Sequence, residues 1–382
     1  MSSRLSPERL VYIIYLAALV IALTGFPLVR YGVYVMPLLA GAVWAFSGGK
    51  YLNFNRETWA FLLLVLLSVV SLVPWDFNTF KKVYFLYVFL SVFILFDFAK
   101  LEIDFRFLAG YLIVVGVINA LTRGSPGVAE EFSVANSKSF LETTFAFPLS
   151  MVALYLLITK RYLWALLSTV FFVVFLKRVA MLAFVIALLV WLSPKRIRSL
   201  ILHPVTLTAG GVAVMVASIA FAQGWFDNYV FDYLGRSPND FSKGRQELWL
   251  SALTATGFNY GDFLLWGTGI GKVVTDLQSQ LHVERVLLHS DLLSLALEIG
   301  IVPFVIFMYL FFSIKHKQGR LFALFLAILF STDNVIIYQH VMFIYLFIQG
   351  DIRRRSRKAP AARGASDAAE ISARAGLTGS VP

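Results

Sequence analysis

The chain has 382 residues, of which 59% are hydrophobic and 14% are charged, with a formal net charge of +11 and no cysteine. Soluble globular domains carry about 25% charged residues, so the composition argues against a soluble globular protein. The missing cysteine excludes disulfides, thiolate catalysis and cysteine-ligated metal sites.

Long apolar runs, separated by short charged breaks, recur along the chain. A helix needs about 20 apolar residues to cross a bilayer, whereas strands of a membrane barrel alternate in polarity over about ten. The runs do not alternate, so we predict an all-α fold, a polytopic transmembrane bundle of about twelve spans. The predicted spans are residues 10–28, 32–47, 58–74, 83–99, 105–121, 143–159, 161–177, 179–193, 204–222, 291–314, 319–333 and 335–349. Either of the pairs 161–193 and 319–349 could instead be a partial hairpin, which leaves the rest of the topology unchanged.

The first run begins after Arg4 and Arg9 and continues past Gly25 and Pro27 into further apolar sequence. A signal peptide would end in a small-residue cleavage site, so we interpret this run as an uncleaved span. If the N-terminus is inside, most lysine and arginine residues fall in inside loops and in the tail. Both termini are therefore predicted to be cytoplasmic. The positive charge is then a topology signal, and no nucleic-acid-binding motif accompanies it.

Two segments fall outside the apolar runs. Residues 223–290 form a long outside loop between the ninth and tenth spans of a bundle that covers residues 1–350. Loops of this length are usually functional or disordered, and its aromatic residues favour order, with short amphipathic helices. The tail, residues 351–382, is basic near the membrane and is predicted to be cytoplasmic and disordered.

Basic residues gather in the outside loop, where Arg236, Lys243 and Arg245 lie close together in sequence. Outside-facing cations oppose the charge bias that orients the chain, and an anionic ligand such as a phosphate is one reason to keep them. The alternatives are solvated loop charges or contacts with anionic lipid head groups. Residues 244–256 are expected to form a helix on the membrane surface.

A glycine-rich stretch, Leu264–Lys272, follows in the same loop. It is not a phosphate-binding Walker A loop, because Trp266 and Val273 stand where that motif needs Gly and Ser or Thr. Glycines permit tight turns and close backbone approach, so we expect a turn that returns the loop to the membrane.

His289 and Ser290 precede the next apolar run. Ser290 can cap the helix that enters the membrane, and a neutral His289 at the interface could accept a proton from a sugar hydroxyl. The alternative for His289 is an interfacial residue that contacts head groups. Glu298 lies deeper in the same helix, where a carboxylate is a functional hypothesis by default. The alternative is a structural ion pair with another helix.

Lys177 and Arg178 form a tight outside turn between two apolar runs, and Arg123 and Lys138 belong to the preceding outside loop. The outer face would thus gather basic residues around His289, which suggests a diphosphate site with one candidate base. No Asp-x-Asp pair occurs in the chain, so we predict no metal and no other cofactor.

The order of these motifs resembles the O-antigen ligase and polysaccharide polymerase superfamily of bacterial inner-membrane glycan transferases. The shared order is Lys177-Arg178 opening a helix, Gly244-Arg245 in a long outer loop, glycines at 267–271, then His289-Ser290 and Glu298-x-Gly300. The resemblance covers about residues 110–315. Ser290 stands where the family often has Asn, Lys177 where it often has Ser, and Pro303 where it often has Gly.

The resemblance implies transfer of a glycan from undecaprenyl diphosphate to an acceptor hydroxyl on the periplasmic face, without metal or nucleotide. The acceptor would be the lipid A core for a ligase or another lipid-linked glycan for a polymerase, and other envelope-assembly proteins are possible partners. His289 corresponds to the residue that activates the acceptor. Arg178 and Arg245 correspond to diphosphate-holding positions, and Arg236 is a weaker correspondence. Lys177, Arg123 and Lys243 would add positive charge, and Glu298 would support the site.

Two other functions remain open. A transporter or flippase for a lipid-linked or anionic glycan would need charged residues along a path through several helices. A non-catalytic scaffold in an envelope-assembly complex would leave the basic residues around His289 unexplained.

Overall fold

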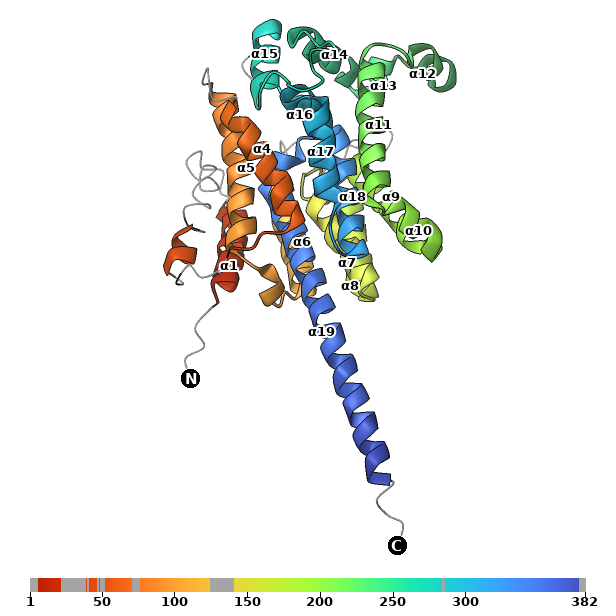
Figure 1. Ribbon diagram of the computed structural model, residues 1–382. Helices are drawn as coiled ribbons and strands as arrows, with labels where there is room; N and C mark the ends of the chain where they lie inside the picture. The colour runs from red at the N-terminus through yellow and green to blue at the C-terminus, as the bar shows by residue number, and fades with distance from the viewer. Residues whose placement is uncertain are drawn as a thin grey trace.

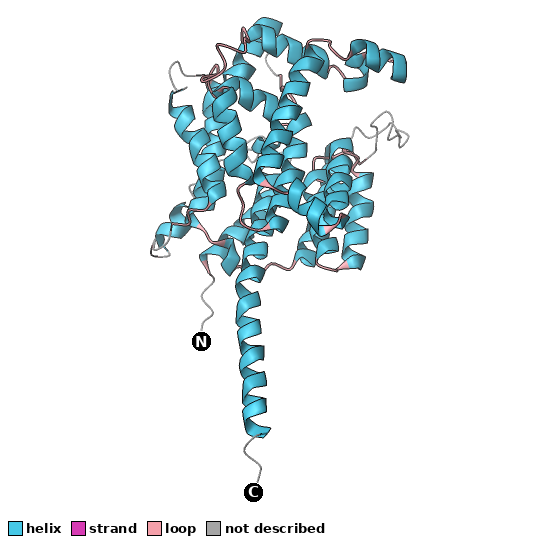
Figure 2. Ribbon diagram, turned by 45° about the vertical axis from the view of Figure 1, so that its right-hand side comes forward, coloured by secondary structure: helices cyan, strands magenta, loops and turns pink. Residues whose placement is uncertain are grey.

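The structure is a computed structural model of the chain and describes residues 6–21, 39, 41–46, 48, 52–70, 76–123, 141–283 and 286–377. All regular secondary structure in these residues is helical, which confirms the predicted all-α class (Figure 2). Most of the predicted span 32–47, and the loop that holds Lys138, lie outside the described residues.

Most helices pack side by side in one bundle (Figure 1). The start of α1 and the end of α19 lie at one end of the bundle, called here the terminal end, and α12–α15 lie at the opposite end, called here the loop end. The helices of the bundle are α1 (Pro7–Ile21), α4 (Arg56–Val70), α5 (Phe77–Leu95), α6 (Phe105–Arg123), α7 (Ala146–Ile158), α8 (Tyr162–Val174), α9 (Arg178–Leu192), α10 (Lys195–Ile201), α11 (Pro204–Ala222), α16 (Asp291–Ile299), α17 (Ile301–Phe312), α18 (Lys317–Thr332) and α19 (Gln339–Leu377). The loop end adds α12 (Asp227–Leu234), α13 (Pro238–Ser242), α14 (Arg245–Ala255) and α15 (Lys272–Leu281), and short 3-10 turns are η1 (Phe98–Lys100) and η2 (Val335–Ile337).

Two described helices, α6 and α11, are long and apolar enough to cross a bilayer, and α7, α8, α9 and α17 are shorter apolar helices. Several of these helices point large apolar side chains away from the bundle. The side chain of Leu163 in α8 is 76% exposed, and that of Leu189 in α9 is 62% exposed. In α8 the exposed apolar residues recur at the spacing of one helix face, Leu163, Leu166, Leu167 and Val170, and an exposed apolar face of this kind marks an interaction with lipid or with another protein. Length and surface together support the expected membrane location.

The predicted span 291–314 is wrong as a single helix, because the chain breaks at Gly300 between α16 and α17. Gly300 has φ +92°, and a Cβ atom there would lie 2.8 Å from the backbone nitrogen of Trp266. The next residue donates its N–H to the carbonyl of Phe263 at 2.8 Å. The returning loop therefore inserts against the helix break, which no apolar pattern could predict.

Two other boundaries differ from the predicted spans 83–99 and 335–349. Helix α5 begins at Phe77 because the Asp76 side chain accepts the N–H of Thr79 at 2.8 Å, so Lys81 and Lys82 lie in a helix and not in a loop. The last span begins with η2, because Ile336 donates its N–H to Asp291 Oδ2 at 2.8 Å. Because of this bond, the regular α-helix of this span begins only at Gln339.

The expected boundary at Gly350 is corrected, because α19 continues through it to Leu377. Asp351 is 1% exposed and accepts hydrogen bonds from Tyr155 of α7 and from Arg354 and Arg355 of its own helix. The first turns after Gly350 therefore belong to the bundle. The remaining part of α19 is rich in alanine and arginine, which are both strong helix formers. It is helical, whereas the composition predicts disorder.

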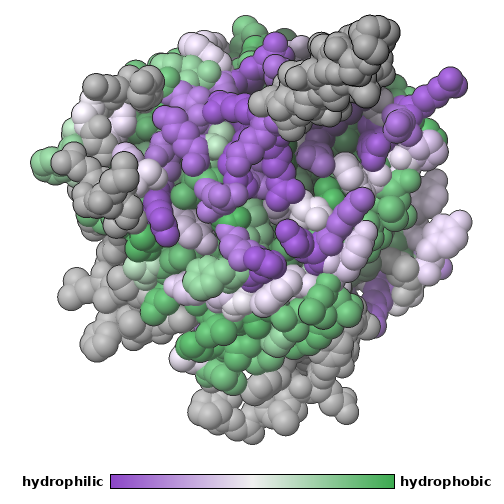
Figure 3. Space-filling view, turned by 90° about the horizontal axis from the view of Figure 1, so that it is seen from below, coloured by the Kyte–Doolittle hydropathy of each residue, from purple (hydrophilic) through white to green (hydrophobic). Residues whose placement is uncertain are grey.

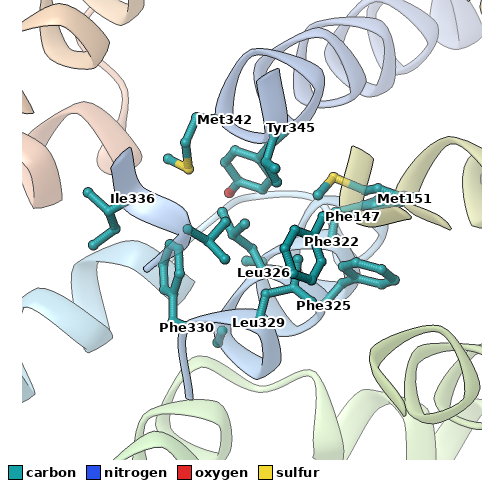
Figure 4. Close-up of a cluster of buried hydrophobic side chains, with 14 of the residues drawn as sticks. Phe147, Met151, Phe322, Phe325, Leu326, Leu329, Phe330, Ile336, Met342 and Tyr345 are labelled. Atoms are coloured by element: carbon teal, nitrogen blue, oxygen red, sulfur yellow. The ribbon is translucent and has the colours of Figure 1, made fainter. Parts of the chain in front are cut away.

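The core that connects the two ends is aromatic and fully enclosed (Figure 4). Phe147 and Met151 of α7 face Phe322 and Phe325 of α18, and Tyr345 of α19 joins them; all five are buried. Side chains of this size contribute about 1.5–3 kcal/mol each when buried. This packing fixes α18 and α19, and with them the turn at Asp333, at the loop-end side of the core.

Candidate functional site

The basic pair Lys177-Arg178 lies at the start of α9, which begins at Arg178. The preceding residues are anchored: Leu176 is fully buried, and the Phe175 carbonyl accepts the Thr143 N–H at 3.2 Å. Lys177 Nζ contacts Glu142 Oε1 at 2.5 Å. A cation at a helix N-terminus opposes the helix dipole, so Arg178 stands where an anion would be favoured.

A second basic pair, Lys243 and Arg245, stands at the start of α14. Lys243 and Gly244 both have positive φ, +55° and +79°, and this double left-handed turn directs the chain into the helix. One turn later, Trp249 is buried and donates Nε1–H to the Leu288 carbonyl at 2.8 Å. That bond places α14 beside the residue that precedes His289.

His289 lies in a short turn just before α16. Ser290 caps this helix by accepting the Leu293 N–H at 3.2 Å, as predicted. His289 Nδ1 lies 3.8 Å from Asp333 Oδ1, which is close enough for an ion pair with a protonated imidazole but longer than a hydrogen bond. Asp333 is held in turn by the Tyr338 hydroxyl at 3.1 Å and the Asn334 N–H at 2.8 Å. The imidazole is half-exposed, and the carboxylate behind it is fixed.

The charged groups affect one another's pKa, which shows that several of the basic residues lie close together. Burial lowers the pKa of Lys243, and repulsion from Arg178, Arg245 and Lys177 lowers this pKa further while Glu142 opposes them. Burial also lowers the pKa of Arg245, with Asp333 opposing and Arg178 reinforcing the shift. Asp333 therefore faces both His289 and Arg245. These mutual effects define one group of four cations beside the imidazole, called here the basic cluster: Lys177, Arg178, Lys243 and Arg245.

The two arginines of the basic cluster form no direct contact with a carboxylate. Among the described residues, neither Arg178 nor Arg245 has a hydrogen-bond or ion-pair partner. Arg178 is exposed and Arg245 is half-buried. Guanidinium groups are forked donors suited to phosphate oxygens. The cluster can therefore accept an anion with more than one negative charge.

The backbone is strained at the same place. Five described residues other than glycine have positive φ, and three of them adjoin or belong to this group: Leu176 (+41°), Lys243 (+55°) and His289 (+53°). Such conformations cost about 1–3 kcal/mol each and persist where the surrounding structure enforces them, often at functional sites. The three turns all set the direction of a cation or of the imidazole.

Glu298 forms an ion pair with another helix, which was the alternative to a functional role. Its Oε2 lies 2.7 Å from Lys82 Nζ of α5, and the two side chains are 0% and 11% exposed. Ser294 shares the pair, with its Oγ 2.8 Å from Lys82 Nζ and 3.1 Å from Glu298 Oε1. The carboxylate is thus an ion-pair partner that joins α16 to α5, and its expected support of the basic cluster would be indirect.

The glycine-rich stretch packs against the bundle as a turn. A Cβ atom at Gly267 would lie 2.2 Å from the Leu297 carbonyl oxygen, and Thr268 donates its N–H to that oxygen at 2.9 Å. The glycines therefore serve close backbone approach to the end of α16, as expected for a loop that returns to the membrane.

Two of the predicted basic residues are not brought into the basic cluster by the described interactions. Arg236 is exposed between α12 and α13. Arg123 is the last residue of α6, one turn beyond Asn119, which accepts the Thr143 hydroxyl proton at 2.9 Å. The C-terminal end of α6, at Arg123, thus lies near the start of α9. The side chain of Arg123 is not among the described parts of the chain.

The sequence did not reveal two residues that complete this region, Asp333 and Lys82. Asp333 follows an apolar run and Lys82 lies at the start of another, so each resembles an ordinary helix boundary. The only available signal was that a carboxylate next to an apolar run requires a partner. Their partners, His289 and Glu298, lie far away in the sequence.

The described residues contain no group of three or more histidine, cysteine, aspartate or glutamate side chains able to hold a metal ion. Comparison with known protein families, with curated proteins and with solved structures finds no match for the chain. The function must therefore be argued from the geometry of the site.

Proposed function

We propose that the protein is a multi-pass membrane enzyme of about twelve spans that transfers a glycan from a polyprenyl diphosphate to an acceptor hydroxyl. The site would lie at the loop end, on the periplasmic face of a bacterial inner membrane, with both termini cytoplasmic. The observation that carries the proposal is the basic cluster beside His289 and Asp333. Its two arginines form no hydrogen bond or ion pair with a described residue, so their guanidinium donors are available to a diphosphate.

The chemistry follows from the positions of these groups. His289 takes the proton of the acceptor hydroxyl, and Asp333 stabilises the imidazolium that forms. The acceptor oxygen attacks the anomeric carbon, and the bond between that carbon and the diphosphate oxygen breaks. The diphosphate leaves with an additional negative charge, which Arg178 and Arg245 stabilise more strongly than they stabilise the bound donor. A lipid A core or a second lipid-linked glycan can supply the hydroxyl, which distinguishes a ligase from a polymerase.

The test is transfer from a synthetic lipid-linked oligosaccharide by the purified protein in lipid nanodiscs. His289→Ala should lower the transfer rate by about 10²–10⁴-fold, the usual contribution of a general base. His282→Ala is the matched control, because His282 is an exposed histidine of the same loop, also with positive φ, at the end of α15. Full activity in the His289 variant would refute the proposed role of the base. Uptake of the intact donor into vesicles without transfer would favour a transporter.

A further inference from the structure

A second group of cations lies at the terminal end, away from His289. A cavity of about 420 Å³ opens there between the start of α4, the connection from α17 to α18, and α19. Its lining includes Arg56, Lys315, His316, Arg353 and Arg357, with Glu57 as the acidic member. Four cationic residues and a histidine against one carboxylate make this cavity a candidate anion site.

The charges in the cavity are only partly balanced. Arg357 is paired with Asp97, with Nη1 2.8 Å from Oδ2, and Glu57 faces Arg353 closely enough to interact electrostatically. Arg56 and Lys315 have no hydrogen-bond or ion-pair partner among the described residues. Two uncompensated cations therefore remain in the lining, and they come from different segments.

Two buried polar atoms of the lining also lack partners. Arg353 Nε is an unused donor and Glu57 Oε2 an unused acceptor, both buried within the described part of the chain. A buried polar atom without a partner costs about 1–3 kcal/mol. A phosphate oxygen would satisfy the donor, and a hydroxyl group would satisfy the acceptor. The cavity is thus complementary to a phosphate that carries a hydroxyl close by.

The wall formed by α18 adds to this potential. His316 is the N-cap residue of α18 and makes no side-chain capping bond, so the positive end of the helix is open toward the cavity. Burial lowers the pKa of His316, and Lys315, Arg353 and Arg320 lower it further, so the imidazole tends to stay neutral. A bound anion would find donors without a competing carboxylate from this wall.

The surrounding surface favours a lipid as the source of the phosphate. Seen from the terminal end, hydrophilic side chains gather over the middle of the face, and hydrophobic side chains lie around them (Figure 3). Ile314, in the cavity wall, is the first buried apolar residue beyond Lys315. Basic pockets at such a boundary on the cytoplasmic side bind anionic lipid head groups.

We propose that this cavity binds a phosphodiester head group that carries a hydroxyl, as in phosphatidylglycerol. Arg56 and Lys315 hold the phosphate, Arg353 donates to it, and Glu57 accepts the hydroxyl. The same chemistry exists in a soluble glycerol phosphate. The proposal does not depend on the glycan-transfer activity.

The test uses the full-length protein in a neutral detergent and measures binding of dihexanoyl phosphatidylglycerol, dihexanoyl phosphatidylcholine and glycerol 3-phosphate. The pocket variant is Arg56→Gln with Lys315→Gln. The matched control is Lys195→Gln with Arg196→Gln, which removes the same charge from exposed positions on α10 that do not line the cavity. Phosphatidylglycerol should bind about tenfold more weakly to the pocket variant, with the control within about twofold of the native protein.

Each outcome decides a point. Phosphatidylglycerol should bind, phosphatidylcholine should not, and glycerol 3-phosphate should bind much more weakly than the lipid. If glycerol 3-phosphate binds as tightly and with the same sensitivity to the pocket variant, the anion site stands and its occupant is a soluble phosphate. Equal losses in both double variants, or no loss in either, would overturn the proposal. If the double variant does not elute as a single species in gel filtration, Lys315→Gln alone gives the same comparison.

Discussion

The paired arginines of the terminal end and the basic cluster of the loop end use charge in opposite ways. At the terminal end, four described arginines are paired with carboxylates, and two of these pairs join α19 to the residues that flank η1. The pairs are Arg354 with Glu102 and Asp351, Arg355 with Asp351, Arg357 with Asp97, and Arg106 with Asp104. At the loop end, the arginines of the basic cluster repel each other, and neither forms a hydrogen bond or ion pair with a described residue, although Asp333 attracts Arg245. Paired charges hold helices together, whereas repelling cations are kept only for what they bind.

The backbone shows the same contrast. Of the five described non-glycine residues with positive φ, Lys160 lies between α7 and α8, away from the basic cluster, whereas Leu176 and Lys243 directly precede or belong to it, His289 precedes α16 and His282 ends α15. The terminal end is thus built from regular helices joined by ion pairs. The loop end is built from strained turns, so substitutions at the two ends should affect different properties.

The largest effect is expected at Asp351. Asp351→Ala removes a carboxylate that is 1% exposed and bonded to Tyr155, Arg354 and Arg355. Breaking a buried ion pair from one side costs about 3–5 kcal/mol, so the free energy of unfolding should fall by that amount. Transfer activity per folded molecule should stay within about twofold. Denaturant titration of the protein in detergent measures the first quantity, and a large loss of activity without a loss of stability would break the comparison.

The buried pair of the loop end should behave like the charges of the terminal end. Lys82→Ala should lower the free energy of unfolding by about 3 kcal/mol, near the lower limit for buried pairs because the lysine is 11% exposed. Replacing both partners, with Lys82→Met and Glu298→Leu, should recover most of the stability. Glu298 would instead be a functional carboxylate if Glu298→Ala kept the native stability but abolished transfer.

Removing a cation of the basic cluster should change activity and not stability. Arg178→Ala and Arg245→Ala should each lower the transfer rate by about 10²-fold, as for the loss of one donor to a developing charge. The unfolding midpoint should stay the same or rise, since repulsion is relieved. Lysine at either position should restore little, because it lacks the forked donor geometry. Lys272→Ala, at the start of α15, is the control with the same change of charge.

The smallest effect is a pH dependence of anion binding. The pKa of Lys243 is lowered by burial and by neighbouring cations, and a bound anion would raise it again. Binding therefore takes up a proton near this pKa, and affinity should fall by less than about tenfold as the pH rises from 7 to 10. Lys243→Arg should remove the dependence, because arginine stays charged over that range. Titration with pyrophosphate at several pH values measures this pH dependence. An affinity that increases with pH would contradict the role assigned to Lys243.

The sequence predicts features that depend on nearby residues. Apolar runs predicted the all-α class and the bounds of α11, and Ser290 was correctly predicted as the cap of α16. Features that need distant segments were missed. The break at Gly300 depends on residues 263–266, and the pairing of Lys82 with Glu298 depends on helix packing. The contact between His289 and Asp333 depends on where α18 ends. The number of spans, the compartment and the reaction stay predictions.

The left-handed backbone at Leu176 has a consequence for protein engineering. Leu176 has φ +41° and its side chain is fully buried, so one residue carries both backbone strain and core packing. Glycine would release the strain, but the lost side chain would leave a cavity that costs about 2–5 kcal/mol, more than the strain itself. A laboratory selection for heat resistance should therefore retain leucine at this position. The turn that directs Arg178 would then be preserved by selection for thermal stability alone, without any selection for catalysis.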